Sequence, residues 1–168
     1  MADFTFAVDD WCDLDGVIFD FDARATEILG EDPREFEDRE GSDLFWKALR
    51  DSGDFFLKLE LMPGAEELMR YYADAGITPW FLSGVPSQIP EGHYQKQQAV
   101  KNRFGDKQPI VTTQSKHKSN FCRPGARIVD DWPKHVDAWT SKGGLWILHT
   151  SAASSIEQHR VLRQQQGS

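Results

Sequence analysis

The sequence predicts an α/β fold in which a mainly parallel sheet carries helices on both faces. Short apolar runs typical of strands alternate along the chain with segments that have helical spacing or end at a glycine. Three of the apolar runs end in chemically reactive residue types, at Asp13, Ser83 and Asp130. Because the carboxyl ends of parallel strands form the ligand site of such sheets, we expect these three residues to meet at one edge.

The composition predicts a globular protein of one domain with a small insertion. The chain has 168 residues, of which 39% are hydrophobic and 27% are charged. Two cysteines, Cys12 and Cys122, are too few for a disulfide framework and indicate a reducing compartment. A net charge of −8 argues against a broad nucleic-acid-binding face. With no visible signal peptide and no membrane span, we expect a cytoplasmic location.

The first expected strand starts at Phe4 and ends near Asp13, although Asp9 and Asp10 interrupt its apolar run. Residues 24–60 are charged and aromatic, with short helix-like pieces and no strand alternation. In this segment "DLFWKAL" has apolar residues at helical spacing. The stretch "MPGAEELMRYYADAG" predicts a helix with a proline near its start, acids in its first turn and a glycine at its end.

Strands and helices continue to alternate after this helix. We expect strands at 77–84, 109–113, 126–131 and 145–150, and helices at 94–105 and 135–144. A last helix reaches residue 162, with Ser154 or Ser155 as its N-cap. Residues 164–168 have the composition of a disordered tail.

Four motifs in this order resemble the haloacid dehalogenase (HAD) superfamily of phosphotransferases. Within it, the sequence is most similar to the 5'(3')-deoxyribonucleotidase-like branch and to phage-encoded 5'-nucleotidases. The first motif, D-x-D-G-V, begins at Asp13, and the second is "WFLSG" with Ser83. The third is a basic residue within "SKHKSNF". The fourth is "RIVDD", which ends in Asp130 and Asp131.

The resemblance implies a HAD-type Rossmann-like parallel sheet with strand order 5-4-1-2-3. It also implies a core domain of residues 1–23 and 61–163, with a small helical cap at 24–60 inserted after the first strand. Such a cap excludes water and sets specificity. If a phage encodes the chain, the expected location is the host cytoplasm.

The residue types predict phosphoryl transfer through a covalent intermediate. A carboxylate can attack a phosphoryl group and form an aspartyl-phosphate, and we assign this role to Asp13. Asp15, beside a glycine that lets the backbone turn, can protonate the leaving oxygen and then activate water. Ser83 and the backbone N–H of Gly84 are expected to hold a phosphate oxygen.

The acids also predict a Mg²⁺ site, because this ion prefers oxygen ligands and offsets repulsion among carboxylates. The expected ligands are Asp13, Asp15 through its backbone carbonyl, and Asp130, with Asp131 as an alternate ligand. A lysine should neutralise Asp13 and the transferring group. The spacing in related sequences implies Lys118, with Lys116 as the fallback phosphate-binding residue.

We therefore expect Mg²⁺-dependent hydrolysis of a phosphomonoester, most simply a (deoxy)nucleoside 5'-monophosphate, as a small-molecule partner. Phe45 and Trp46, with Phe55, form either the core of the insertion or a face on which a base stacks. Two alternatives remain open. One is a phosphatase acting on the 3'-ends of polynucleotides, and the other is a HAD relative that binds nucleotides or proteins without catalysis. The sequence leaves the oligomeric state open.

Overall fold

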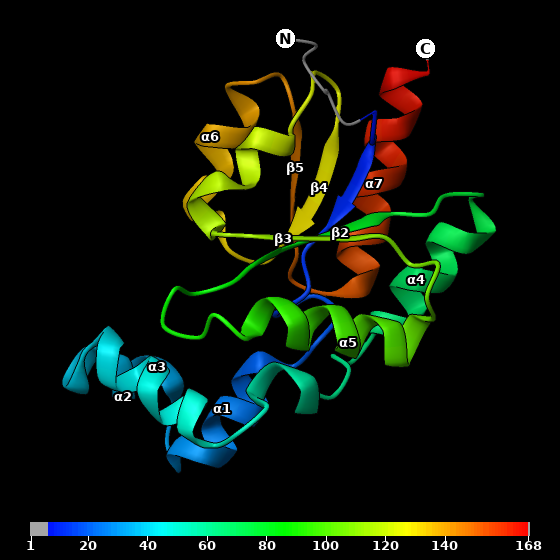
Figure 1. Ribbon diagram of the computed structural model, residues 1–168. Coiled ribbons are helices and arrows are strands. Elements are labelled where there is room, and N and C mark those ends of the chain that lie inside the picture. The colour runs from blue at the N-terminus through cyan, green and yellow to red at the C-terminus, as the bar shows by residue number, and fades with distance from the viewer. Residues whose placement is uncertain (1–6, 168) are drawn as a thin grey trace, which may run out of the picture.

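The computed structural model describes residues 7–167 and has an α/β architecture (Figure 1). The 3-10 helices are labelled η. In chain order the elements are β1 (Asp10–Cys12), α1 (Phe21–Leu29), α2 (Pro33–Glu40), α3 (Ser42–Asp51), η1 (Phe55–Lys58), α4 (Ala65–Asp74), β2 (Trp80–Gly84), α5 (Gly92–Phe104), β3 (Ile110–Thr113), η2 (Ser115–Phe121), β4 (Arg127–Asp130), η3 (Pro133–His135), α6 (Val136–Thr140), β5 (Leu145–Leu148) and α7 (Ala152–Gln166).

The five strands form one parallel sheet in the order β3-β2-β1-β4-β5. This is the expected 5-4-1-2-3 order read from the opposite edge, so the predicted strand order is confirmed. The strands point their carboxyl ends towards the segment that contains α1, α2 and α3 (Figure 1). Residues that follow β1, β2 and β4 therefore face this helical segment.

Successive strand residues point to opposite faces of the sheet and supply two hydrophobic clusters. One face packs against α4, α5 and α7, and its strand residues include Cys12, Phe81 and Val129. The other face packs against Trp139 of α6, and its strand residues include Trp11, Leu82 and Ile128. Burial on both faces explains why these strands read as continuous apolar runs in the sequence.

Residues 21–58 form α1, α2, α3 and η1. Side-chain caps start two of these helices, since Asp20 accepts a hydrogen bond from the Ala23 N–H and Asp32 accepts one from the Arg34 N–H. The segment also contacts α5, because the Phe56 N–H donates to Gln95 Oε1 at 3.0 Å. The expected division into a core domain and a cap at 24–60 stays a prediction.

Several expected boundaries differ from the structure; for example, β2 begins at Trp80 rather than at residue 77, and α6 ends at Thr140 rather than at residue 144. β1 begins only at Asp10, and residues 4–6 of the expected strand lie outside the described residues. The N-cap of α7 is Ser151, whose hydroxyl accepts from the Ser154 N–H at 3.1 Å, so the expected cap at Ser154 or Ser155 is wrong. The chain turns into α7 three residues earlier than the apolar pattern indicates.

The tail expected at 164–168 is also wrong for residues 164–166, which form the last turn of α7. The side chain of Gln166 accounts for this order, because its Nε2 donates to the carbonyl of Gly125 at 2.9 Å. Its Oε1 accepts a second hydrogen bond from Arg127. Ser168 lies outside the described residues.

Within residues 7–167, no helix combines the length and the apolar character that crossing a membrane requires. The cytoplasmic location expected from the sequence stays a prediction.

Candidate active site

Asp13 lies at the carboxyl end of β1, where its N–H donates to the carbonyl of Val129 in β4 at 2.8 Å. The ammonium of Lys118 is 2.9 Å from Asp13 Oδ1 and 2.8 Å from Asp130 Oδ2, and all three side chains are buried. Although burial disfavours a charged amine, the two carboxylates raise the pKa of Lys118. Lys118 therefore stays positive beside Asp13, whereas Lys116 is exposed and makes no such contact.

The structure brings Asp13, Asp130 and Asp131 together at this edge, with one carboxylate oxygen from each lying within 4.8 Å of the others. Burial and the Asp13 charge raise the pKa of Asp130 to about 6. Partial burial and both neighbouring acids raise the pKa of Asp131 to about 7. These raised values show that the three acids repel one another and that a cation among them would be favoured.

The acidic cluster fits Mg²⁺ in its donor chemistry, because hard oxygen ligands are what this ion binds. Asp130 accepts hydrogen bonds from Lys118 and from the Trp132 N–H, on different oxygens. A carboxylate has about four lone-pair sites, so two remain available for a metal. The carboxylate of Asp15 does not join this group, and its expected ligation through the backbone carbonyl stays a prediction.

Asp15 instead pairs with Lys96 of α5, a residue that the sequence analysis did not single out. The buried Lys96 ammonium lies 2.6 Å from Asp15 Oδ2, 2.8 Å from Ser83 Oγ and 2.6 Å from the Gly84 carbonyl oxygen. It also lies 4.3 Å from the centre of the Phe56 ring. The other oxygen of Asp15, Oδ1, is buried and accepts no hydrogen bond from any described residue. Burial raises the pKa of Asp15, and Lys96 opposes this rise.

The structure places the remaining second-motif residues behind Asp15. Ser83 is fully buried and accepts a hydrogen bond from Lys96, and it does not line the cavity described below. Gly84 lines the cavity, and a Cβ on it would lie 1.9 Å from Ser115 Oγ. The lack of a side chain at the end of β2 therefore lets Ser115 of η2 pack closely against the sheet.

Gly16 makes the turn after the first motif. Its φ of +79° is in the left-handed region, which favours glycine. A Cβ at this position would lie 2.0 Å from Asp131 Oδ2. The glycine thus lets the first and fourth motifs approach each other.

A cavity of about 820 Å³ opens onto these residues and extends to the helical segment. Asp13, Asp15, Lys118 and Asp131 are among the residues that line it. The aromatic residues that line it are Phe21, Phe45, Trp46, Phe56 and Trp132. The cationic residues that line it are Arg34, Lys116, Lys118 and Lys134.

Phe45 and Phe55 are buried, and each packs against Phe21, so both belong to the core of the helical segment, as one of the two readings expects. Phe45 and Trp46 also line the cavity, whereas Phe55 does not. Phe45 is only 4% exposed and Trp46 is half-buried, and the stacking of a base on these residues stays a prediction.

Other candidate residues have structural partners. Asp20 caps α1, and Asp22 pairs with Arg34 at 2.9 Å. Cys12 is buried next to Asp13, and burial raises the pKa of its thiol, so it is inert at neutral pH. His149 contacts Ser155 Oγ at 2.8 Å.

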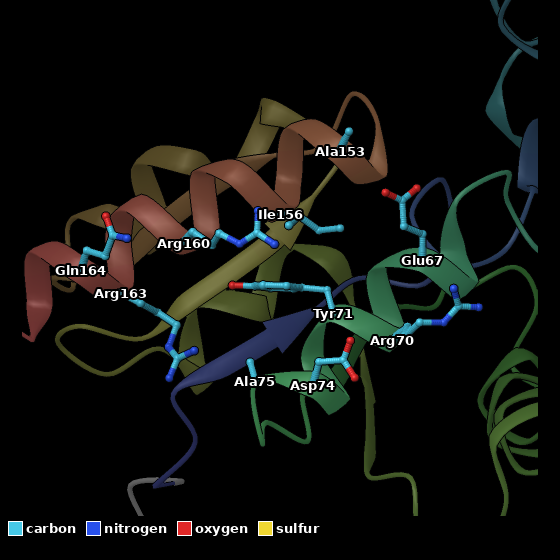
Figure 2. A pocket seen from close by; sticks show the side chains of 10 residues that line it. All are labelled: Glu67, Arg70, Tyr71, Asp74, Ala75, Ala153, Ile156, Arg160, Arg163 and Gln164. Atoms are coloured by element: carbon cyan, nitrogen blue, oxygen red, sulfur yellow. The ribbon is translucent and has the colours of Figure 1, made fainter.

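A second hollow, of about 800 Å³, lies between α4 and α7 and contains none of the motif residues (Figure 2). The ring of Tyr71 extends from α4 towards α7 in this hollow, and the guanidinium of Arg160 lies 5.3 Å from its centre. Tyr71 OH is 2.8 Å from His159 Nδ1, and His159 Nε2 is 2.7 Å from Asp10 Oδ1. This hollow is the outer end of a buried polar network that begins in β1.

The network explains why an acid interrupts the first apolar run. Asp10 is buried, and Arg127 donates to both of its oxygens, at 2.7 and 2.9 Å. Although burial opposes ionisation, hydrogen bonds from His159 and Arg127 hold the pKa of Asp10 at about 2. Asp10 thus remains a paired carboxylate inside the fold.

The sequence matches no protein-family model and no curated protein. Among solved structures, the chain is similar to a hydrolase from Streptococcus pneumoniae TIGR4, with a TM-score of 0.55 and 16% identity over 94% of this chain and 100% of that one. It also aligns with a proposed β-phosphoglucomutase from Bacteroides vulgatus, with a TM-score of 0.41 and 14% identity over 95% of this chain and 91% of that one. The first likeness, together with the strand order, confirms the HAD-type fold expected from the sequence.

Proposed function

We propose that this protein is a phosphomonoester hydrolase that acts through an aspartyl-phosphate on Asp13. The observation that carries the proposal is that Lys118 pairs with Asp13 beside the clustered acids Asp130 and Asp131, and that Asp13, Lys118 and Asp131 line one cavity. The hydrolase from Streptococcus pneumoniae supports a hydrolase in general, and the four ordered motifs support phosphoryl transfer in particular.

In the first step, an oxygen of Asp13 attacks the phosphorus of the ester and the bond to the leaving oxygen breaks. Lys118 stabilises charge on the transferring group, because its ammonium is already held beside Asp13 at 2.9 Å. The leaving oxygen takes a proton from Asp15. Asp15 lines the cavity, and its Oδ1 makes no hydrogen bond with any described residue, so it can carry the proton for the leaving group while Oδ2 is held by Lys96.

In the second step, Asp15 has lost its proton and acts as a base on water. The activated water attacks the phosphorus of the aspartyl-phosphate, which releases inorganic phosphate and restores Asp13. Asp13, Asp130, Asp131 and the carbonyl of Asp15 would hold Mg²⁺. A bound Mg²⁺ would offset the repulsion between the acids and the incoming phosphate.

We propose (deoxy)nucleoside 5'-monophosphates as the substrates. Of the aromatic residues that line the cavity together with Asp13 and Asp15, Phe21 and Trp46 are partly exposed, whereas Phe45 and Phe56 are buried. A base can stack on Phe21 or Trp46 while its phosphate reaches Asp13, and stacking is tolerant of base identity. A nucleoside monophosphate therefore suits the cavity, with its base against the aromatic residues and its phosphate beside Asp13.

A phosphatase assay tests the reaction. We expect Mg²⁺-dependent release of phosphate from a generic aryl phosphate, with activity abolished in Asp13→Asn. Unchanged activity in this variant would show that Asp13 is not the nucleophile. A folded, inactive protein with no hydrolysis of any phosphate ester would favour the non-catalytic alternative.

A substrate panel tests the nucleotide assignment. It compares nucleoside 5'-monophosphates with 3'-phosphorylated oligonucleotides, the substrates of the alternative end phosphatase. Faster turnover of the monophosphates supports our proposal. Hydrolysis of the aryl phosphate with turnover of neither nucleotide class would remove the nucleotide assignment and leave the reaction standing.

A further inference from the structure

Two of the four cations that line the active-site cavity have no acidic partner. Lys118 is paired with Asp13 and Asp130, and Arg34 is paired with Asp22. Among the described residues, no carboxylate oxygen lies within 4.0 Å of the ammonium of Lys116 or Lys134. In a protein of net charge −8, two lysines without acidic partners beside one cavity leave positive charge that an anionic part of a ligand can neutralise.

These lysines come from two loops that lie together. Lys116 is in η2 and Lys134 is in η3, and the two 3-10 helices contact each other. Both loops follow strand ends at the active-site edge, so their lysines border the place where the phosphoryl group would lie. They are not part of the pairing around Asp13.

Lys134 is held in place by aromatic neighbours. Its ammonium lies 4.8 Å from the centre of the Trp132 ring, and the His135 ring packs edge-on against the same indole. Trp132 is 49% exposed although it is a large apolar residue, and it lines the cavity. The contact places the exposed Lys134 ammonium over a ring that lines the cavity.

The same loop has an unmet hydrogen bond. His135 Nε2 is buried and has no partner among the described residues. Burial and the charges of Lys118 and Lys134 lower the pKa of His135, so the ring is neutral near neutral pH. A neutral imidazole can donate one N–H to a ligand oxygen in the cavity that it lines.

We propose that Lys116, Lys134 and His135 form a subsite for a second phosphate group of the substrate, apart from the phosphate that is hydrolysed. This inference rests on the proposed phosphatase function. The second group is either another phosphate on the same nucleotide, as in a nucleoside 3',5'-bisphosphate, or the first phosphodiester of an oligonucleotide end. Lys118 and the metal site serve the first phosphate, and the unpaired lysines serve the second.

Three thymidine substrates test the subsite. They are thymidine 5'-monophosphate, thymidine 3',5'-bisphosphate and a 5'-phosphorylated thymidine dinucleotide, each assayed for kcat/KM with identification of the products. We expect at least one substrate with two phosphates to exceed the monophosphate about tenfold, since two exposed charge pairs contribute roughly threefold each. Whichever of the two shows the preference identifies the source of the second phosphate.

The double variant Lys116→Ala/Lys134→Ala should lose this preference, and Lys134→Arg should keep most of it because the charge remains. Lys107→Ala is the matched control, since Lys107 is an exposed lysine that does not line the cavity. The inference is wrong if the wild-type protein shows no preference, or if the double variant retains it.

A binding experiment distinguishes failure of the proposed phosphatase function from failure of the subsite. If no substrate is hydrolysed, calorimetric titration of the monophosphate, the bisphosphate and the 5'-phosphorylated dinucleotide into Asp13→Asn with Mg²⁺ decides the question. Tighter binding of either compound with two phosphates that disappears with the two lysine substitutions supports the subsite without the reaction. Equal binding of all three nucleotides, or no binding, overturns it.

Discussion

The substitution Lys96→Met is expected to change the pH dependence of the proposed reaction. It keeps a long apolar side chain in the same buried place and removes the ammonium. The three hydrogen bonds lost are those to Asp15 Oδ2, Ser83 Oγ and the Gly84 carbonyl oxygen. Of these acceptors, only Asp15 carries a charge, so Asp15 bears the main effect.

The magnitude follows from the environment of Asp15. Removing one partner of a buried ion pair costs about 3–5 kcal/mol when the other charge is left uncompensated. Asp15 avoids most of this cost by taking up a proton, because burial already raises its pKa and Lys96 opposes that rise. A protonated Asp15 cannot activate water, so we expect a loss of about 100-fold or more in kcat near neutral pH.

The sign of the pH effect is fixed by the base role of Asp15. A higher pKa means that a smaller fraction of Asp15 is deprotonated at a given pH. The acidic limb of the kcat profile should therefore move to higher pH in Lys96→Met, and activity should recover in part as pH rises. The assay is hydrolysis of an aryl phosphate across a pH series with saturating Mg²⁺.

Lys101→Met is the matched control, because Lys101 lies on the same helix and is exposed. It should retain the wild-type profile. A variant Lys96→Met that loses activity equally at every pH would show that Lys96 only positions the site. A variant with wild-type kcat would refute the link between Lys96 and the ionisation of Asp15.

Further predictions follow from the same geometry. In the aryl phosphate assay, Lys118→Ala should lower kcat at least 100-fold, because Lys118 contacts Asp13. Lys116→Ala should lower kcat far less, because Lys116 makes no such contact. The reverse ranking would assign the third-motif role to Lys116. Gly16→Ala should abolish activity in a protein that still folds by circular dichroism, since the added Cβ would lie 2.0 Å from Asp131 Oδ2. Asp10→Asn should destabilise the protein by about 2 kcal/mol in urea unfolding near pH 7, because folding lowers the pKa of Asp10 from its ordinary value to about 2. A carboxylate whose pKa is lowered by folding stabilises the folded protein at pH values above the pKa that it has in the unfolded chain. The difference in the free energy of unfolding between Asp10→Asn and wild type should therefore shrink as pH falls from about 4 to about 2. A difference that stays constant over this range would contradict this account.

The position of the acids at the edge of the sheet could be predicted from sequence because strand ends are a local feature. An apolar run followed by a polar residue marks where a strand leaves the core, and parallel strands put such residues side by side. Asp13 and Asp130 are found together for this reason. The choice of Lys118 over Lys116 came from the resemblance, and the structure gives it a physical basis in burial.

Lys96 was missed because its helix has no clear apolar face. Lys96 does lie on the same helical stripe as Ala99 and Val100, three and four residues later, and all three are buried. A lysine on the same side of a helix as small apolar residues was the sequence signal that could have identified Lys96. Its partner in the first motif is 81 residues away, so no local pattern could identify the pair.

The boundaries failed where side chains decide them over long distances. In the sequence Asp10 interrupts an apolar run, yet it begins β1, because its charge is paired with Arg127 and His159, which are remote in sequence. The composition of the last residues indicates disorder, yet Gln166 is fixed by the loop before β4. Composition cannot report contacts of this kind.

The tie between Asp10 and His159 has a consequence for the order in which the polypeptide acquires its shape during synthesis. β1 is the central strand, but the imidazole that its carboxylate contacts belongs to α7, which is synthesised after all five strands. While α7 is still inside the ribosome, the nascent sheet has a buried acid with one partner missing. Emergence of α7 then completes the pairing, and a chain that stops short of it leaves this central strand incompletely neutralised.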